Sequence, residues 1–169
     1  SLNEQTLCCG LVTSDDDCNE YRPIEEVIND AVTRYDELVS LIPVGVYIVW
    51  IRANGHFDFE YVSDRWCAIH CLNREDVLAD ADVVNNLVHP DDRERFLESN
   101  RKALRGHQPF QWEGRYFTGD GRLLWLRIES APAVFEDGDV RFFGVTQDIT
   151  ERKQSEQEIQ ELLAERDLL

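Results

Sequence analysis

The sequence predicts an α+β domain: a five-stranded antiparallel sheet with short helices on one face, flanked by an amphipathic helix at each end. Three observations support this fold class. Two apolar segments with strand-like composition come first, several helix start signals follow, and three further alternating segments end the domain. Short glycine-containing turns join the last three segments, so these are expected to pair as an antiparallel meander.

The first expected element is preceded by a polar, aperiodic stretch, residues 1–21, which is interpreted as a mobile lead or linker. Residues 22–42 then predict an amphipathic helix that ends before Pro43. Its apolar side chains recur at alternating spacings of four and three, and they are Ile24, Ile28, Ala31, Tyr35, Leu38 and Ile42. This seam has to pack either on the domain behind it or on a second copy of the chain.

The next two elements are strands that form a hairpin. The segment GVYIVWI is rich in β-branched and aromatic residues, which is typical of a buried strand. After the turn RANG, the segment HFDFEYV alternates, which places Phe57, Phe59 and Tyr61 on one face. The hairpin is therefore expected to turn that face toward the core.

Short helices follow the hairpin. Ser63 and Asn73 are expected to cap the segments DRWCAIHCL and REDVLAD. The clearest helix is HPDDRERFLESNRKALRG, with Pro90 in its first turn and Gly106 at its end. Three strands, PFQWEGRYF, RLLWLRIESAPAVF and VRFFGVTQDI, then complete the sheet.

Four segments, in this order, resemble the PAS sensory domains that are common in bacterial and archaeal signalling kinases and cyclases. They are FEYVSDRWCAIHCLNREDVL, VHPDDRERF, EGRYFTGDGRLLWL and FFGVTQDITERK, and the resemblance covers residues 36–153. It implies a PAS sensor over residues 43–149 and a signalling helix over 150–169 that leads to an output domain. The implied parent protein is a sensor histidine kinase, with a diguanylate cyclase as the alternative.

The resemblance also implies that a ligand, where one is bound, lies between the inner face of the sheet and the helices. Strand alternation and the helix preceding Asn73 give nine pocket candidates: Tyr47, Val49, Trp66, Trp112, Gly114, Leu126, Ile128, Phe142 and Thr146. Gly114 and Gly144 lack side chains, so a cavity could open beside them. The alternative is that all these residues fill an ordinary core.

Flavin and haem are not expected as cofactors, although an unidentified small-molecule ligand stays open. Flavin-binding relatives carry the motif NCRFLQ on a helix. Alignment from SDRW without gaps places its asparagine and cysteine on Ala81 and Asp82, and the flavin-contacting glutamine of the last strand on Thr146. Haem-binding relatives need an axial histidine on the long helix, but His89 belongs to its cap and His107 lies past its end.

No catalytic or metal site is expected in this chain. There is no nucleophile motif and no phosphate-binding glycine loop, and alternation directs Asp58, Glu60 and Glu113 away from the core. The motif CAIHC, residues 67–71, offers two thiols and an imidazole, but no fourth ligand stands at zinc-like spacing. We therefore interpret its members as ordinary helix residues.

Charge and composition limit the partners that this chain can have. A net charge of −17 opposes binding to nucleic acid, and no apolar run reaches the roughly 18 residues of a membrane span. The five cysteines are an odd number with two adjacent, which indicates a reducing, cytoplasmic compartment, although the parent could be membrane-anchored. The chain has no methionine, even at position 1, so we expect a piece of a longer protein.

Two hypotheses for function follow. The first is a sensor in which a bound small molecule moves the exit helix. The second is a ligand-free relay and homodimerisation module. In both, Asp148 and Thr150 are predicted to couple the last strand to the helix, Thr150 as its N-cap and Asp148 by pairing with Arg152 or with nearby backbone donors.

Overall fold

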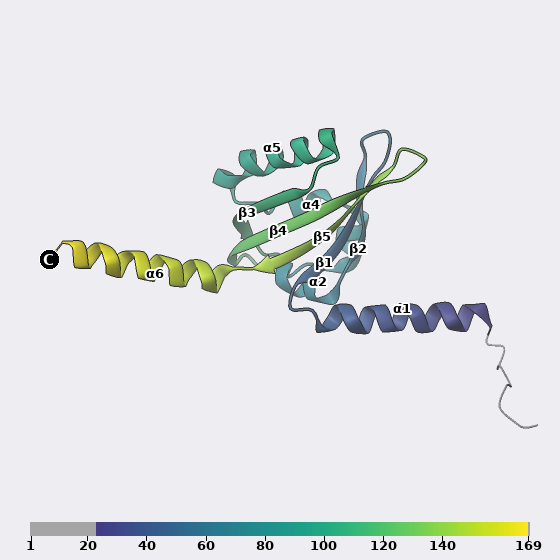
Figure 1. Ribbon diagram of the computed structural model, residues 1–169, viewed down its shortest axis with the longest axis horizontal. Helices are drawn as coiled ribbons and strands as arrows, with labels where there is room; N and C mark the ends of the chain where they lie inside the picture. The colour runs from purple at the N-terminus through teal and green to yellow at the C-terminus, as the bar shows by residue number, and fades with distance from the viewer. Residues whose placement is uncertain (1–22, 169) are drawn as a thin grey trace, which may run out of the picture. The chain divides into compact units, whose positions relative to one another are not determined.

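The computed structural model describes residues 23–168 (Figure 1), so the lead predicted over 1–21 and Leu169 lie outside the described residues. The predicted N-terminal helix is α1 (Ile24–Leu41). The chain divides between Arg34 and Tyr35 into two compact units, and the whole sheet belongs to the second.

The five predicted strands form one antiparallel sheet in the order β2-β1-β5-β4-β3. Their bounds are β1 (Gly45–Ile51), β2 (Phe57–Val62), β3 (Phe110–Phe117), β4 (Leu123–Val134) and β5 (Val140–Asp148). The last three strands pair as a meander, as expected. Strand β5 then adds to the first hairpin by pairing with β1, which brings the two ends of the domain together at the centre of the sheet.

A bulge in β2 changes the predicted alternation of the first hairpin. Ile48 pairs with Tyr61 but its neighbour Val49 pairs with Phe59, so one residue of β2 has no counterpart in β1. An extra residue reverses the face on which the following side chains lie. The prediction that Tyr61 shares a face with Phe59 is therefore wrong: Val62 is fully buried in the core, whereas the Tyr61 ring contacts the ring of Tyr35.

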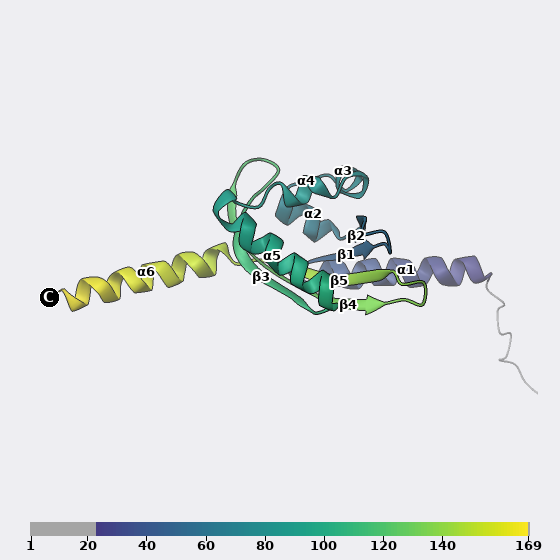
Figure 2. The ribbon, with the colours of Figure 1, turned by 90° about the horizontal axis from the view of Figure 1, so that it is seen from above.

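The helices between β2 and β3 lie together on one face of the sheet, as predicted (Figure 2). They are α2 (Asp64–His70), α3 (Arg74–Ala79), α4 (Asp82–Asn85) and α5 (Pro90–Gly106). Ser63 and Asn73 cap α2 and α3 through their side chains, and Pro90 begins α5, as expected. The short helix α4 was not predicted, because one turn carries too little periodicity to be recognised.

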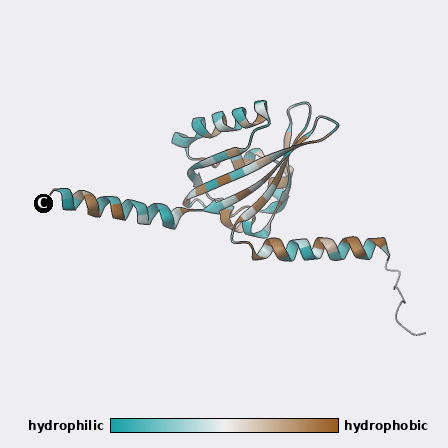
Figure 3. Cartoon of the chain, viewed as in Figure 1, coloured by the Kyte–Doolittle hydropathy of each residue, from teal (hydrophilic) through white to brown (hydrophobic). Residues whose placement is uncertain are grey.

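The core lies between this helical layer and the inner face of the sheet. Two buried clusters fill it, one around Phe96 and Trp112 under α5, and one around Trp66 and Val77 under α2 and α3. Figure 3 shows the corresponding apolar residues along the strands, whereas α6 (Thr150–Asp167) is mainly hydrophilic. No residue of α6 is buried, so its apolar side chains do not dock on the described part of this chain.

Candidate ligand pocket and output junction

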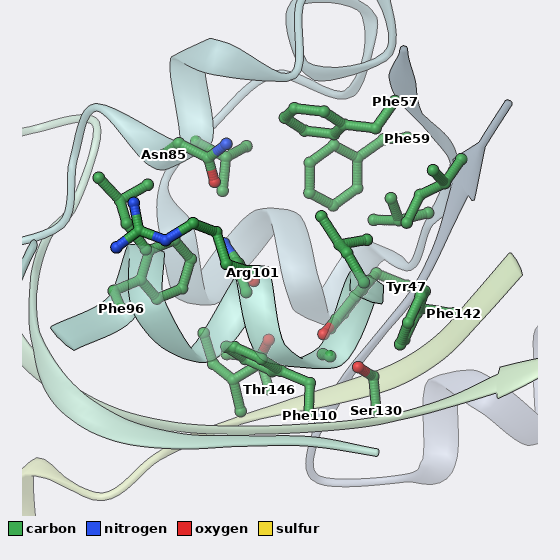
Figure 4. Close-up of a pocket in the computed structure, with 18 of the residues that line it drawn as sticks. Tyr47, Phe57, Phe59, Asn85, Phe96, Arg101, Phe110, Ser130, Phe142 and Thr146 are labelled. Atoms are coloured by element: carbon green, nitrogen blue, oxygen red, sulfur yellow. The ribbon is translucent and has the colours of Figure 1, made fainter. Parts of the chain in front are cut away.

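A cavity of about 300 Å³ lies between the inner face of the sheet and the helices (Figure 4). Its size is at the lower end of the range for small-molecule sites. The wall is mainly aromatic, and its phenylalanines are Phe57, Phe59, Phe96, Phe110 and Phe142. The cavity therefore presents flat apolar surfaces on several sides.

Six of the nine predicted pocket residues line this cavity: Tyr47, Val49, Trp66, Ile128, Phe142 and Thr146. The other three, Trp112, Gly114 and Leu126, lie in the part of the core under α5 and do not reach the cavity wall. The ring of Trp112 stands edge-on to that of the wall residue Phe96, at 5.1 Å between centroids.

The two glycines of the inner face do not open a cavity, so the alternative of an ordinary core holds at these two positions. A Cβ on Gly114 would lie 2.2 Å from the indole of Trp112, and a Cβ on Gly144 would lie 2.2 Å from the ring of Tyr47. Each glycine is therefore covered by an aromatic ring. The missing side chains make room for protein rings rather than for a ligand.

The opposite wall of the cavity comes from residues that the sequence analysis did not single out. Phe96, Asn100 and Leu104 recur at a spacing of four on α5, and Arg101 is beside them. This spacing places one stripe of the helix on the cavity and could have identified it. Asn85 completes the wall from α4 (Figure 4), and α4 itself was not predicted.

His70 is the most unusual member of the wall. It is 1% exposed, its ring stacks on that of Trp66 at 3.9 Å between centroids, and it meets the ring of Tyr116 edge-on at 4.8 Å. Neither ring nitrogen has a hydrogen-bond partner among the described residues. Because burial removes water from the charged form, the pKa of His70 falls to about 3, so the imidazole is neutral near pH 7.

Three hydroxyl groups lie on the sheet side of the cavity, from Tyr47, Ser130 and Thr146 (Figure 4). Tyr47 and Ser130 both pair with Gly144, one from each side, so Tyr47, Gly144 and Ser130 form a row across the sheet. Burial raises the pKa of Tyr47 to about 12, although a hydrogen bond with Ser130 opposes that shift. The Thr146 hydroxyl is also buried and has no partner among the described residues.

The exit helix α6 begins at the edge of this same region. Its first residue is Thr150, so the prediction that Thr150 is the N-cap is wrong; Ile149 holds that position, without a side-chain cap. The Thr150 hydroxyl instead accepts a hydrogen bond from the backbone N–H of Trp125 at 3.0 Å and donates one to Asp148 at 2.6 Å. Thr150 thus ties the start of α6 to the neighbouring strand β4.

Asp148 and Ile149 complete this junction. The Asp148 carboxylate accepts from the backbone N–H of Thr150 at 3.0 Å, which confirms the predicted pairing with a nearby backbone donor. No ion pair between Asp148 and Arg152 occurs; Arg152 pairs with Glu113 and Glu156 instead. Ile149 is 3% exposed and its N–H donates to the Trp125 carbonyl, so it anchors the junction in the core.

Glu113 is a junction residue that alternation placed correctly on the outer face but did not identify. Its carboxylate lies 3.0 Å from the guanidinium of Arg152, 3.4 Å from the ammonium of Lys153 and 3.9 Å from Arg127. Partial burial alone would raise the pKa of Glu113, but the hydrogen bonds from Arg152 and Lys153 outweigh it and hold that pKa below its usual value. Strand β3 is thereby linked electrostatically to the first turn of α6.

The remaining predictions concern metals and membranes. Among residues 23–168, no group of three or more His, Cys, Asp and Glu side chains could hold a metal ion, and Cys67 and Cys71 are free thiols. Within the same span, no helix combines the length and apolar character needed to cross a bilayer. Cys8, Cys9 and Cys18 lie outside the described residues.

Comparison with protein families decides which fold this is. The model of the family described as "PAS fold" matches residues 59–146, just over half of the chain. The chain belongs to the PAS family. The matched segment runs from β2 to the cavity residue Thr146 on β5, so it includes most of the wall of the PAS pocket.

Three similar proteins illustrate where such domains occur. The uncharacterized protein y4lL of Sinorhizobium fredii is 27% identical over 90% of this chain, which spans 18% of that protein. The human voltage-gated delayed rectifier potassium channel KCNH4 is 27% identical over 72% of the chain, which spans 12% of the channel. The crystal structure of a sensory box histidine kinase/response regulator from Burkholderia thailandensis superposes with a TM-score of 0.61, at 23% identity, over 80% of this chain and 99% of that one.

Proposed function

We propose that this PAS domain senses a small molecule in its cavity and transmits occupancy through α6 to an output domain, most simply that of a sensor histidine kinase. The observation that carries the proposal is the cavity itself, whose wall contains buried polar groups that have no partner among residues 23–168. Buried polar groups are normally hydrogen-bonded. A ligand with complementary groups would supply the hydrogen-bond partners that these polar groups lack in the free domain.

The strands supply a short path from the cavity to α6. Thr146 lines the cavity, and two residues later on β5 Asp148 binds Thr150 at the start of the helix. On β4, Ile128 pairs with Thr146 and lies three residues from Trp125, whose N–H donates to Thr150. A displacement of either strand by a ligand would therefore alter the geometry at the first turn of α6.

The test compares two β1 valines that lie on opposite faces of the sheet. Val49 lines the cavity and Val46 does not. Native mass spectrometry of the wild-type chain should show a bound small molecule, or one acquired from a metabolite extract. Val49→Phe, which fills the cavity, should abolish that mass, and Val46→Phe should retain it. Equal retention in both variants, or no bound mass under any condition, would contradict the proposal.

An absorption spectrum of the same sample tests the nature of the ligand. We expect no visible band, because Ala81, Asp82 and Thr146 stand where flavin-binding relatives carry flavin-contacting groups. Ala81 precedes α4 and Asp82 begins it, and neither is part of the cavity wall, whereas Thr146 is. A flavin or haem spectrum in protein purified with that cofactor supplied would contradict this expectation.

A ligand-free relay and homodimerisation module is the second candidate, favoured by apolar side chains on the surface. Phe143 and Val145 are exposed on the outer face of the sheet, and Leu38 of the α1 seam is exposed as well. We expect α1 to contribute to a homodimer, so that Ile28→Asp combined with Leu38→Asp gives folded monomers. Light scattering that shows the wild-type chain already monomeric at high concentration would exclude this role for the seam.

A further inference from the structure

Two side chains in the cavity wall carry polar atoms that no described residue satisfies. They are the hydroxyl of Thr146 and both ring nitrogens of His70, and each residue is 1% exposed. An unsatisfied buried polar group destabilises the folded protein, so such groups are rare and require an explanation. Since both line one cavity, a single occupant could satisfy them.

The charges around the cavity argue that this occupant is uncharged. Among the described residues, no Asp, Glu or Lys lines the wall, so nothing there would balance a cation. His70 is neutral because its burial lowers its pKa, so it offers one donor and one acceptor rather than a positive charge. Arg101 is the cation of the wall, but its guanidinium already pairs with Glu98 at 2.7 Å on the surface of α5.

The shape of the wall argues for a flat molecule. The aromatic rings of β2, α5, β3 and β5 surround the cavity, and aromatic rings pack best against the faces and edges of other rings. The polar requirement is also specific. A threonine hydroxyl and a neutral imidazole each offer both a donor and an acceptor, so the best partner is a group that does the same. An amide or lactam has this property without a charge.

We propose that the cavity binds an uncharged, planar ring compound that carries an amide or lactam group, with this group hydrogen-bonded to Thr146, His70 or both. This inference rests on the proposed sensor function and narrows it to a ligand class.

The experiment uses three probes that share one ring system and differ in the polar group: 2-naphthamide, 2-naphthoate and 2-methylnaphthalene. Each is titrated into the 169-residue chain at pH 7, and the dissociation constant is obtained from backbone amide shifts in NMR spectra. We expect 2-naphthamide to bind at least tenfold more tightly than the other two. The shifts should centre on residues of the cavity wall.

Variants then identify the groups responsible. Thr146→Val keeps the shape but removes the hydroxyl, and should weaken 2-naphthamide about tenfold while leaving 2-methylnaphthalene unchanged. His70→Phe should also weaken the amide selectively, since it retains a ring to stack on Trp66. The matched controls are Thr33→Val and His56→Phe, at exposed positions outside the cavity wall, which should change neither affinity.

Thermal melts of the ligand-free proteins are a second measurement. They distinguish a hydroxyl that stabilises the fold from one that has no partner until a ligand binds. Because the buried Thr146 hydroxyl has no partner in the described part of the chain, Thr146→Val should melt at the same temperature as wild type or slightly above it. A melting temperature lowered by more than a few degrees would show that the hydroxyl is already satisfied in the free domain, which would overturn the inference.

The outcomes separate the ligand class from the sensor function. Tighter binding of 2-naphthoate, or equal binding of 2-methylnaphthalene, at the same residues would overturn the ligand class and leave the sensor function standing. If none of the probes shifts a cavity residue up to its solubility limit, and native mass spectrometry also finds no bound molecule, both proposals fail together.

Discussion

The cavity wall and the α6 junction both involve strands β4 and β5, but their side chains differ in chemistry. The wall is buried and neutral, and its polar atoms on Thr146 and His70 have no partners among the described residues. The junction is partly exposed and charged, and its central carboxylate, on Glu113, has three cationic neighbours. Single atoms should therefore matter much more in the wall than at the junction, where one ion pair can replace another.

The largest expected effect comes from protonating His70. Its folded-state pKa of about 3 lies below the value near 6.5 of an unfolded chain, so the folded state binds fewer protons between those values. Its unfavourable contribution is absent above about pH 6.5 and grows as the pH falls toward 3. Between pH 7 and pH 4 this one group should lower the free energy of unfolding by about 3 kcal/mol.

The measurement is urea unfolding at both pH values for wild type, His70→Phe and His56→Phe. His70→Phe should lose about 3 kcal/mol less than wild type on acidification, because the rings that contact His70, those of Trp66 and Tyr116, carry no charge in this range. His56 is exposed and its carboxylate partner Asp58 is also partly exposed, so the loss of this pair changes stability by only about 0–1 kcal/mol and the variant should follow wild type closely. Equal acid losses in all three proteins would show that water reaches His70 in the folded domain.

The second effect concerns the row of residues across the sheet. Gly144→Ala places a methyl group 2.2 Å from the Tyr47 ring, which must move and so disturb the hydrogen bond between Tyr47 and Ser130. Overpacking of this kind costs about 1–3 kcal/mol. Gly106→Ala is the control. The added Cβ meets the flexible side chain of Gln108, which can move aside, and alanine is a better helix former than glycine in the last turn of α5. A crystal structure of Gly144→Ala with Tyr47 unmoved would contradict this account.

The difference between the two regions also explains which features the sequence could predict. Strand alternation and caps are local, so the five strands, the caps Ser63 and Asn73 and most of the inner-face residues were found correctly. The bulge in β2 was missed because one extra residue changes the face of Tyr61 and Val62 without changing composition.

Long-range partners were harder to predict. Nothing near Gly144 in the sequence shows that the ring of Tyr47, 97 positions earlier in the chain, occupies the space of its missing side chain. A cavity beside Gly144 therefore stayed open as one of two interpretations. Glu113 was similarly assigned to the outer face without its partner Arg152, which is brought near only when β3 and the start of α6 meet. Pairings of this kind follow from the assembled sheet rather than from any local pattern.

The third effect is at Thr150 and has two readouts. Thr150→Val removes the hydrogen bonds to the Trp125 N–H and to Asp148, which should cost about 1 kcal/mol and lower the melting temperature by a few degrees. Regulation of output in the parent protein should be lost, because a switch depends on only a few kcal/mol between its states. Asp148→Ala should act in the same direction.

Thr150→Ser is the matched control, since it retains the hydroxyl and should restore both stability and regulation. Output activity is measured with and without stimulus, beside a thermal melt of each variant. Unchanged regulation in Thr150→Val and Asp148→Ala would mean that the junction is only a linker. A collapsed melting temperature would mean that the bridge is needed for the fold, and would remove the argument for coupling.

The smallest effect is expected at Glu113, where the charge network is redundant. After Glu113→Gln, Arg152 and Lys153 retain Glu156, which lies 3.5 and 3.7 Å away from them. Partly exposed ion pairs contribute about 0–1 kcal/mol and are screened by salt. Hydrogen exchange in the first turn of α6 should therefore rise less in Glu113→Gln than in Thr150→Val. The difference between Glu113→Gln and wild type should also shrink in 1 M salt, because charges are then screened beyond about 3 Å. If Glu113→Gln instead loosens α6 more than Thr150→Val does, the charges rather than the hydroxyl bridge hold the helix, and the contrast between wall and junction is reversed.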